Sequence, residues 1–354
     1  MPLQTGSILT EDAKKALGEF GDGYSICDFC LGRLCGITNP PVREFVHEIL
    51  PEFLGCEVAT LTYGARDGIF IVMHSLAEPG ASVIVDGNRH YTTVVAAERA
   101  GLDVIEVASS GYPEYRIDVN AYIPLIEKHN PKLILLTYPD GNYGNLPDAK
   151  RLGEIAQEHD IPYIVNGAYA VGRMPVSMEE LGADFIVGSG HKSMASAGPS
   201  GVLGMRKEWE SKVLRKSQAY DNKEIELLGC SLRGVPLITL MASFPSVAER
   251  IQHWDEQVSK AQWFSGELEK LGFRQLGEIP HRHDLLHFET PMLYDISKHI
   301  RERGYFLYKE LKERGIWGPQ PGLTKAFKVS TFAADKEQLG FVIDSFKAIL
   351  SKYS

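Results

Sequence analysis

The stretch FIVGSGHKSMASAGPSG (185–201) decides how the fold is interpreted, because it sets a single lysine, Lys192, among small residues. The apolar run 185–187 before it and the apolar pair Val202 and Leu203 after it are typical of buried strands. A lysine between two buried strands is either a solvated loop residue or a nucleophile held at the end of a sheet. The small neighbours favour the nucleophile, because they leave room for a ligand beside the backbone.

Short β-branched runs alternate with helical patterns through the first two thirds of the chain. The expected strands are 82–86, 103–108, 132–139, 162–169, 183–189 and 201–205, and the expected helices are 91–101 and 148–160. Strands joined by crossover helices form a parallel sheet that is covered on both faces, so we predict an α/β fold. Such sheets bind ligands at the carboxyl ends of their strands, where this chain reads NRH, PDGNYG, NGAY and SGHK.

The pattern changes at about residue 236. A mostly helical stretch is expected at 237–271, another helix at 296–315 and a final helix at 335–353. Short strands are expected at 273–279, 284–290 and 325–331. We therefore predict an N-terminal segment and large domain over 1–235 and a smaller C-terminal α+β domain over 236–354.

The bulk composition excludes several classes of protein. With 354 residues, of which 44% are hydrophobic, the chain can bury the cores of more than one domain. A net charge of −9 argues against strong non-specific nucleic-acid binding but is compatible with a local basic patch. No apolar run is long enough to span a bilayer, and the N-terminus lacks the order of a signal peptide, so we expect a cytoplasmic protein without membrane contact.

The lysine stretch and the strand ends before it resemble the fold-type I pyridoxal 5′-phosphate (PLP) enzymes, in which a Ser-x-His-Lys at a strand end carries the Schiff-base lysine. The resemblance covers most of residues 55–210 and implies that Lys192 is that lysine. It also implies a mainly parallel seven-stranded sheet sandwiched by helices in the large domain. The chemistry needs a neutral amine, which burial and nearby positive charge favour.

The same resemblance implies the cofactor contacts. GARDGIF (64–70) opens a helix, and the N–H groups of Ala65 and Arg66 would hold the cofactor phosphate. His90 would stack on one face of the cofactor ring and Ala168 would pack on the other. The remaining implied contacts are Asn142, Asn166, Ser189 and His191. For Ala168 and Ser189, ordinary packing of a small residue is an equally good interpretation.

Asn166 departs from the family pattern, which has an aspartate facing the pyridine nitrogen. An uncharged amide stabilises a protonated ring nitrogen less than a carboxylate does. The departure favours β-elimination with a good leaving group over chemistry that needs a long-lived carbanion.

The five cysteines form no disulfide framework in a reducing compartment. CDFC (27–30) has the spacing that lets two thiols reach one metal, one cluster or each other, but no second CxxC follows. Cys35 and Cys230 are further candidate ligands, whereas Cys56 is expected to be a small packing residue.

CDFC, together with TYGARDG, GNRHYTT and SGHKSMASAGPSGVLG, is similar to the archaeal O-phosphoseryl-tRNA:cysteinyl-tRNA synthase family over essentially the whole chain. This resemblance implies a PLP-dependent β-replacement on phosphoserine carried by tRNA(Cys), with sulfur from a persulfide or sulfide donor. It implies a homodimer with active sites at the subunit interface and leaves room for a complex with the phosphoseryl-tRNA synthetase. A persulfide would form on Cys27, Cys30 or Cys230, and an iron–sulfur cluster on the same three cysteines is the alternative; no other metal site is expected.

The leaving phosphate needs cations. Arg66 is the first candidate, because the dipole of a helix N-terminus disfavours an arginine unless an anion binds there. His90 and Tyr91 are expected close by as proton donors or positioning groups. His281 and His283 are expected in a solvated loop rather than at a second anion site.

A tRNA would have to meet a local basic patch. The best stretch is 205–217, although a solvated charged helix face is at least as good an interpretation. Two other functions remain open: a cysteine desulfurase or selenocysteine lyase acting on free amino acids, and a protein that only carries sulfur or holds a cluster.

Overall fold

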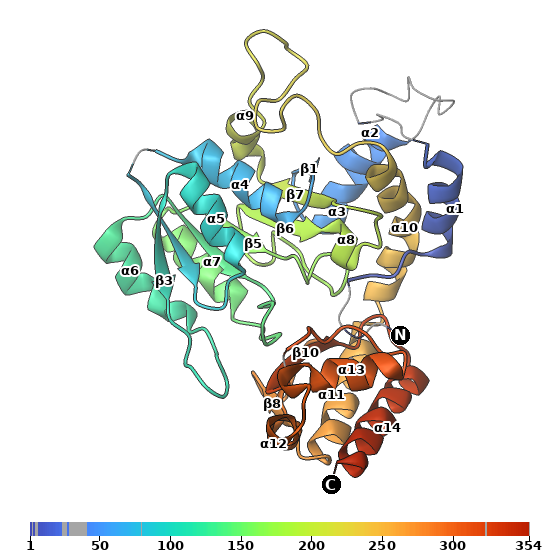
Figure 1. Ribbon diagram of the computed structural model, residues 1–354. Coiled ribbons are helices and arrows are strands. Elements are labelled where there is room, and N and C mark those ends of the chain that lie inside the picture. Colours follow the sequence, from blue (N-terminus) through green and yellow to red (C-terminus); the bar gives the residue numbers. More distant parts are fainter. Residues whose placement is uncertain are drawn as a thin grey trace.

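The computed structural model describes residues 1, 3, 6–22, 27, 41–78, 80–322 and 324–353. Two sheets organise these residues (Figure 1). A seven-stranded sheet has the order β1-β7-β6-β5-β4-β2-β3, and a three-stranded sheet has the order β10-β9-β8. The large sheet and its helices occupy the upper part of the view, and the small sheet lies below it with the last helices.

The large sheet is mainly parallel, as predicted. Its strands are β1 (Val58–Thr62), β2 (Ser82–Asp86), β3 (Asp103–Val107), β4 (Leu133–Thr137), β5 (Tyr163–Asn166), β6 (Phe185–Ser189) and β7 (Gly201–Met205). Strands β2 to β6 pair in parallel, whereas β7 is antiparallel to both β6 and β1. Because β7 follows β6 after a short connection, it runs back from the edge where β6 ends.

Both faces of this sheet are covered. Along β4, Leu133 and Leu135 join one apolar cluster, and Ile134 and Leu136 join the other. Helices α4 (Ala65–Leu76) and α5 (Tyr91–Ala100) contribute to the first cluster. Helices α6 (Tyr122–His129) and α7 (Ala149–Glu158), with the short turn η2 (Val119–Ala121), contribute to the second. The fold class expected from the sequence is therefore confirmed.

Shorter elements complete this part of the chain. They are α1 (Glu11–Phe20), α2 (Val42–Glu44), the π-helical turn η1 (Phe45–Ile49), α3 (Leu50–Leu54), α8 (Gly190–Ser193), η3 (Lys207–Trp209) and α9 (Glu210–Val213). Among the described residues, no helix combines the length and the apolar character needed to span a bilayer.

The C-terminal part mixes helices with the small antiparallel sheet. Its elements are α10 (Val235–Ile251), α11 (Trp254–Glu269), β8 (Arg274–Leu276), β9 (Leu285–Glu289), α12 (Pro291–His299), η4 (Arg303–Tyr305), α13 (Phe306–Glu313), β10 (Ala326–Ser330) and α14 (Lys336–Lys352). The single helix expected at 296–315 is wrong: Ile300 is extended and Arg303 has a φ of 48°, so the helix is divided. Leu237 and Leu240 of α10 pack in a core of the large sheet, and the domain boundary after residue 235 stays a prediction.

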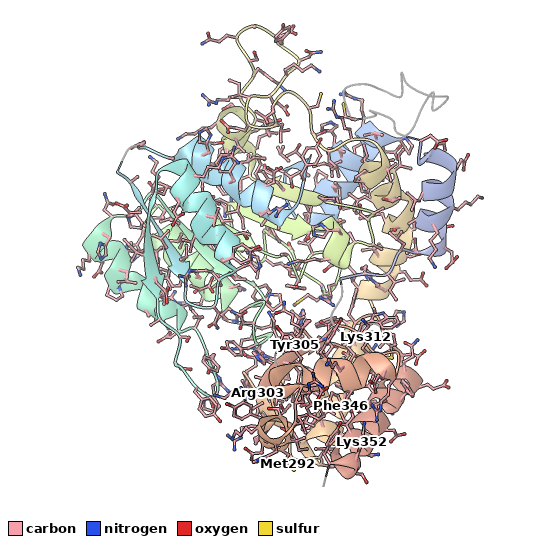
Figure 2. All side chains as sticks on the ribbon, in the orientation of Figure 1. Met292, Arg303, Tyr305, Lys312, Phe346 and Lys352 are labelled. Atoms are coloured by element: carbon pink, nitrogen blue, oxygen red, sulfur yellow. The ribbon has the colours of Figure 1, made fainter. Side chains whose placement is uncertain are left out.

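The C-terminal helix closes the small sheet. Phe346 of α14 is fully buried and stacks on Phe327 of β10, at 5.5 Å between ring centroids. Lys352 at the end of α14 forms an ion pair of 2.6 Å with Glu310 of α13. Figure 2 labels Phe346 and Lys352 on this helix.

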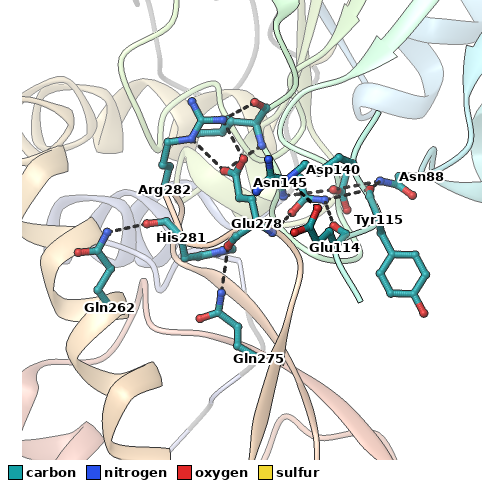
Figure 3. A network of polar contacts seen from close by, with 12 residues as sticks. Asn88, Glu114, Tyr115, Asp140, Asn145, Gln262, Gln275, Glu278, His281 and Arg282 are labelled. Carbon is teal, nitrogen blue, oxygen red and sulfur yellow. Dashed lines mark hydrogen bonds and ion pairs between the residues drawn. The ribbon is translucent and has the colours of Figure 1, made fainter. Parts of the chain in front are cut away.

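A buried polar network joins the two parts of the chain (Figure 3). The Asn145 amide donates to the carbonyl oxygens of Glu114 and Tyr115, and its oxygen accepts the N–H of Glu278 at 2.8 Å. Glu278 in turn pairs with Arg282 at 2.8 Å. The loop after β4 is thereby tied to the loop between β8 and β9.

Candidate active site

A cavity of about 220 Å³ lies at the carboxyl ends of β5 and β6. Nine of the predicted site residues line it: Ala65, Arg66, His90, Tyr91, Asn166, Ala168, Ser189, His191 and Lys192. These residues come from four separate segments of the sequence. Parallel strands end at one common edge, and this geometry brings the segments together.

Lys192 follows β6 in the short helix α8, and its side chain reaches into the cavity. Its Nζ atom lies 4.1 Å from the centre of the Tyr169 ring. Burial, together with the positive charge of Arg173, lowers the pKa of Lys192 to about 8. Roughly a tenth of the amine is therefore neutral at pH 7, which suits a nucleophile or a base.

The first turn of α4 forms another wall of the cavity. Gly64, its N-cap, has a φ of 130°, and a Cβ on Gly201 would lie 2.6 to 2.7 Å from the Gly64 backbone. Glycine at both positions lets β7 approach this turn closely. The N–H groups of Ala65 and Arg66 have no acceptor within the helix, so this turn can bind an anion.

Two histidines flank Lys192 in an uncharged state. Burial first, and then the charges of Lys192, Lys328 and Arg66, lower the pKa of His90 to about 4. His90 caps α5: its Nδ1 accepts the N–H of Thr92, and its ring lies 4.3 Å from the exposed Tyr91 ring. Burial also lowers the pKa of His191, whose Nδ1 lies 3.2 Å from the carbonyl oxygen of Ser200. Neither ring therefore adds a positive charge beside Lys192.

Asn166 ends β5 and is 3% exposed. Its side-chain oxygen accepts the N–H of Ala168 at 3.4 Å. Asn142 does not line the cavity, although its neighbour Gly141 does. The Asn142 amide instead donates to the carbonyl oxygen of Asn88 at 3.3 Å, so its cofactor contact stays a prediction.

The small residues around Lys192 pack against protein. A Cβ on Gly190 would lie 2.4 Å from the Ser200 hydroxyl, and one on Gly6 would lie 2.4 Å from the Lys192 Cα. Met194 and Ala195 are also buried. The size of Gly190 therefore serves close packing of the turn. Gly198 and Pro199 are exposed and Pro199 lines the cavity, so the expectation that small residues after Lys192 leave room for a ligand stays a prediction.

Sequence reasoning missed Tyr169 and Arg173. Tyr169 lines the cavity, and its place directly after Ala168 was the signal that could have identified it. Arg173 is fully buried and pairs with Asp284 at 3.0 Å, a contact between residues 111 positions apart. No local sequence pattern predicts an ion pair between residues so far apart in the chain.

The described residues include three of the five cysteines. Cys27 is buried, and Cys30 and Cys35 lie outside the described residues. Cys230 lies in a separate cavity of about 620 Å³ beside Tyr63 and Asp67, and Lys223 Nζ lies 3.5 Å from its sulfur. No group of three or more His, Cys, Asp or Glu among the described residues could hold a metal ion, so the iron–sulfur cluster has no support there. Burial raises the pKa of Cys56 to about 11, which fits its expected packing role.

The basic stretch 205–217 begins at the opposite edge of the sheet, because β7 runs away from the cavity. Arg206 pairs with Asp184, Lys207 with Glu210, Arg215 with Glu226 and Lys216 with Glu224. This pairing leaves little positive charge for RNA and does not favour the stretch as a tRNA contact.

His281 and His283 are not in a solvated loop, so that expectation is wrong. They are 3% and 0% exposed. His283 pairs with Asp284 at 3.0 Å and contacts the Trp254 ring, and His281 Nε2 lies 2.5 Å from the Leu285 carbonyl oxygen. Tertiary packing buries the short loop that the composition suggests is exposed.

Comparison with known proteins agrees with this geometry. The family model "O-phosphoseryl-tRNA(Sec) selenium transferase, SepSecS" matches residues 37–348. The O-phospho-L-seryl-tRNA:Cys-tRNA synthases of Methanosarcina acetivorans and Methanosarcina mazei are 55% and 56% identical to this chain. Each alignment covers 99% of this chain and 93% of the relative.

Solved structures show the same relationship. The SepCysS chain crystallised with the SepCysE N-terminal domain is 48% identical, with a TM-score of 0.93 and coverage of 99% of this chain and 94% of that one. A cysteine desulfurase from Thermococcus onnurineus has a TM-score of 0.79 at 15% identity, covering 99% and 95% of the two chains, and shares the fold alone. The chain belongs to the SepSecS family, and within it to the O-phospho-L-seryl-tRNA:Cys-tRNA synthases.

Proposed function

We propose that the chain is a PLP-dependent transferase that converts O-phosphoseryl-tRNA(Cys) into cysteinyl-tRNA(Cys). The family supports the reaction, since the relatives carry the name of this synthase. The single structural observation that supports it most is the buried Lys192 amine in a cavity lined by the first turn of α4, His90 and Ala168.

The residues of the cavity fit PLP. Lys192 offers one amine of lowered pKa for an aldehyde, and the first turn of α4 offers unpaired N–H groups for a phosphate. His90 is uncharged and able to stack on an aromatic ring. When bound, PLP supplies an aldehyde for the amine and an electron sink that eases loss of the α-proton and of the β-phosphate.

The chain's own groups then have distinct tasks. Lys192, released as a neutral amine, takes the α-proton at its Nζ atom. The Arg66 guanidinium binds the departing phosphate by charge-assisted hydrogen bonds. Asn166, Ala168, Ser189 and His191 line the cavity. With PLP bound, Asn166 would face the ring as an uncharged amide, Ala168 would pack on it, and Ser189 and His191 would hold the phosphate. Tyr91, which is exposed at the cavity rim, positions the substrate.

A persulfide on Cys230, Cys27 or Cys30 delivers the sulfur. Its terminal sulfur bonds to the β-carbon, and a second thiolate attacks the inner sulfur and breaks the S–S bond. The product leaves with its thiol. Sulfide then attacks one sulfur of the enzyme disulfide, the other sulfur leaves as a thiolate, and the persulfide is restored. Lys223 Nζ lies 3.5 Å from the Cys230 sulfur and places a positive charge beside it, so Cys230 is our first candidate for the carrier.

The partners follow from the same proposal. The substrate is tRNA(Cys) carrying phosphoserine, and a second copy of the chain is proposed to complete the active site. Cys230 and Lys192 line different cavities of one chain, and this separation is what a contribution from a partner copy would explain. A complex with the phosphoseryl-tRNA synthetase is a further proposal.

One assay tests the reaction against its rivals. The purified chain, loaded with PLP, is incubated with phosphoseryl-tRNA(Cys), free phosphoserine or free cysteine, each with a sulfide source. We expect cysteine to form only on the tRNA. Turnover of free cysteine would indicate a desulfurase, and full sulfur transfer by Lys192→Ala would indicate a sulfur carrier; either result would contradict the proposal.

A further inference from the structure

One aromatic ring beside Lys192 contacts two cations. Lys192 Nζ lies 4.1 Å from the centre of the Tyr169 ring, and the Arg173 guanidinium carbon lies 5.4 Å from the same centre. Tyr169 lines the cavity, and Arg173 does not. Each cation is attracted to the ring face, but the two positive charges repel each other.

The small sheet fixes the position of Arg173. Its Nε atom pairs with Asp284 at 3.0 Å, and one terminal nitrogen donates to the Ser330 hydroxyl at 2.7 Å. Asp284 directly precedes β9, and Ser330 is the last residue of β10. The Phe332 ring lies 4.1 Å from the guanidinium carbon. Arg173 belongs to the loop after β5, so these contacts cross between the two parts of the chain.

We propose that Arg173 is a positioning residue for Lys192: held by Asp284 and Ser330, it shares the Tyr169 ring with the Lys192 amine, places a fixed positive charge beside that amine and directs it into the cavity. The proposal rests on the proposed role of Lys192 and adds a link to it. The small sheet, through Arg173, contributes to the reactivity of a lysine on the large sheet.

The charges around Lys192 support this role. His90 and His191 are uncharged at neutral pH, and Arg66 is positive, so none of these cavity groups offers a counter-charge. Asp284 is the carboxylate that pairs with Arg173, and its pKa is about 2 because the charges of Arg173 and His283 outweigh the effect of burial. It is therefore already engaged. Burial, followed by Arg173, lowers the pKa of Lys192.

The test measures the lysine itself. Full-length, cofactor-free chain is labelled with trace acetic anhydride from pH 6 to 10, and acetyl-Lys192 is quantified by mass spectrometry. The neutral amine forms an amide bond, acetate leaves, and the amine proton passes to solvent. In the double variant Arg173→Met, Asp284→Asn, which removes both charges, labelling at pH 7 should fall about threefold to tenfold, with the midpoint displaced to higher pH.

Control variants separate electrostatics from folding. Arg173→Lys keeps the charge and should restore most of the labelling, while Ser330→Ala removes one anchor and should give an intermediate effect. The matched control is Arg282→Met, Glu278→Gln, because this second arginine–carboxylate pair also joins the two parts of the chain yet lies outside the Lys192 cavity. It should leave the pH midpoint unchanged.

The outcomes are distinct. A lower melting temperature of the Arg173 variants with an unchanged pH midpoint for Lys192 would overturn the proposal and make Arg173 a purely structural residue. If the double variant does not fold, Ser330→Ala and Arg173→Lys decide between the two roles by the same midpoint. Labelling requires neither tRNA nor sulfur, so its result is independent of whether the proposed synthase reaction is correct.

Discussion

The two edges of the seven-stranded sheet carry positive charge in different ways. At the carboxyl edge, Lys192 and Arg66 form no ion pair within the described ranges. At the opposite edge, Arg206 pairs with Asp184 at 3.4 Å and Lys207 pairs with Glu210 at 2.5 Å. A paired surface cation contributes little to stability and has little charge left for a ligand. An unpaired cation in a cavity is costly for the fold and available for an anion, so the carboxyl edge is arranged for chemistry.

Removing the lysine at the carboxyl edge gives the largest expected effect. Lys192→Ala should reduce sulfur transfer to phosphoseryl-tRNA(Cys) about a thousandfold or more, because the nucleophile and proton acceptor is lost. Lys207→Ala, the matched change at the opposite edge, should change the rate less than about twofold. Single-turnover rates with PLP-loaded protein measure both. Equal losses would remove the functional distinction between the two edges.

Arg66 should give the second largest effect. Arg66→Gln should lower kcat/KM for the phosphoseryl substrate about tenfold to a hundredfold, because charge-assisted hydrogen bonds to phosphate are lost. Arg206→Gln is the matched change at the opposite edge of the sheet. Its kcat/KM for the same substrate should stay within about twofold of that of the parent chain. If Arg66→Gln were silent while Arg206→Gln was impaired, the phosphate would have to be bound elsewhere.

Keeping the unpaired charge of Lys192 in the cavity should lower the free energy of unfolding. Because the pKa of Lys192 is lowered to about 8, the unfolded chain holds more protons between that pH and the ordinary value of 10.5. The cost is therefore complete below pH 8 and disappears as the pH rises toward 10.5. Lys192→Met should raise the free energy of unfolding at pH 7 by about 1 to 3 kcal/mol, and the gain should shrink at pH 10.

Urea unfolding of the cofactor-free chain at pH 7 and pH 10 measures this gain. Lys207→Met is the control and should show no gain at either pH, since its partner Glu210 is exposed and the pair contributes little. A Lys192→Met chain that is less stable at pH 7 would mean that the lysine stem contributes more by packing than its charge costs.

The sequence predicts the carboxyl edge well for a physical reason. Strands such as 82–86 and 163–166 have local apolar patterns, and parallel strands bring their ends to one edge whatever the details of packing. Lys192, His90 and Asn166 could therefore be placed together without a structure. Their placement at this edge does not depend on contacts between distant side chains.

What escaped prediction depends on such contacts. Arg173 and Asp284 meet because the small sheet docks beside the loop after β5, and this docking leaves no periodic pattern in either segment. His283 was expected in solvent because its loop is polar, yet Asp284 and Trp254 enclose it. Gly190, two residues before Lys192, is small because the Ser200 hydroxyl packs against it, a contact that the local sequence does not reveal. Tertiary complementarity, which local composition does not encode, decides each case.

Lys216 and Lys223, in one short segment, give a second comparison of a lysine paired with a carboxylate and a lysine that is not, and the effect expected there is the smallest. Lys216 pairs with Glu224 at 2.5 Å across a β-bridge, whereas Lys223 directs its ammonium at the Cys230 sulfur at 3.5 Å. An ammonium at this distance attracts the negative charge on the sulfur as it attacks an electrophile. Lys223→Ala should slow iodoacetamide alkylation of Cys230 at pH 7 about threefold, and Lys216→Ala should leave it nearly unchanged. Mass spectrometry of the Cys230 peptide gives both rates, and Lys223→Arg should retain most of the reactivity. Equal slowing by both alanine variants would mean that the conformation of the whole segment controls the reactivity of Cys230, and that the charge of Lys223 has no special role.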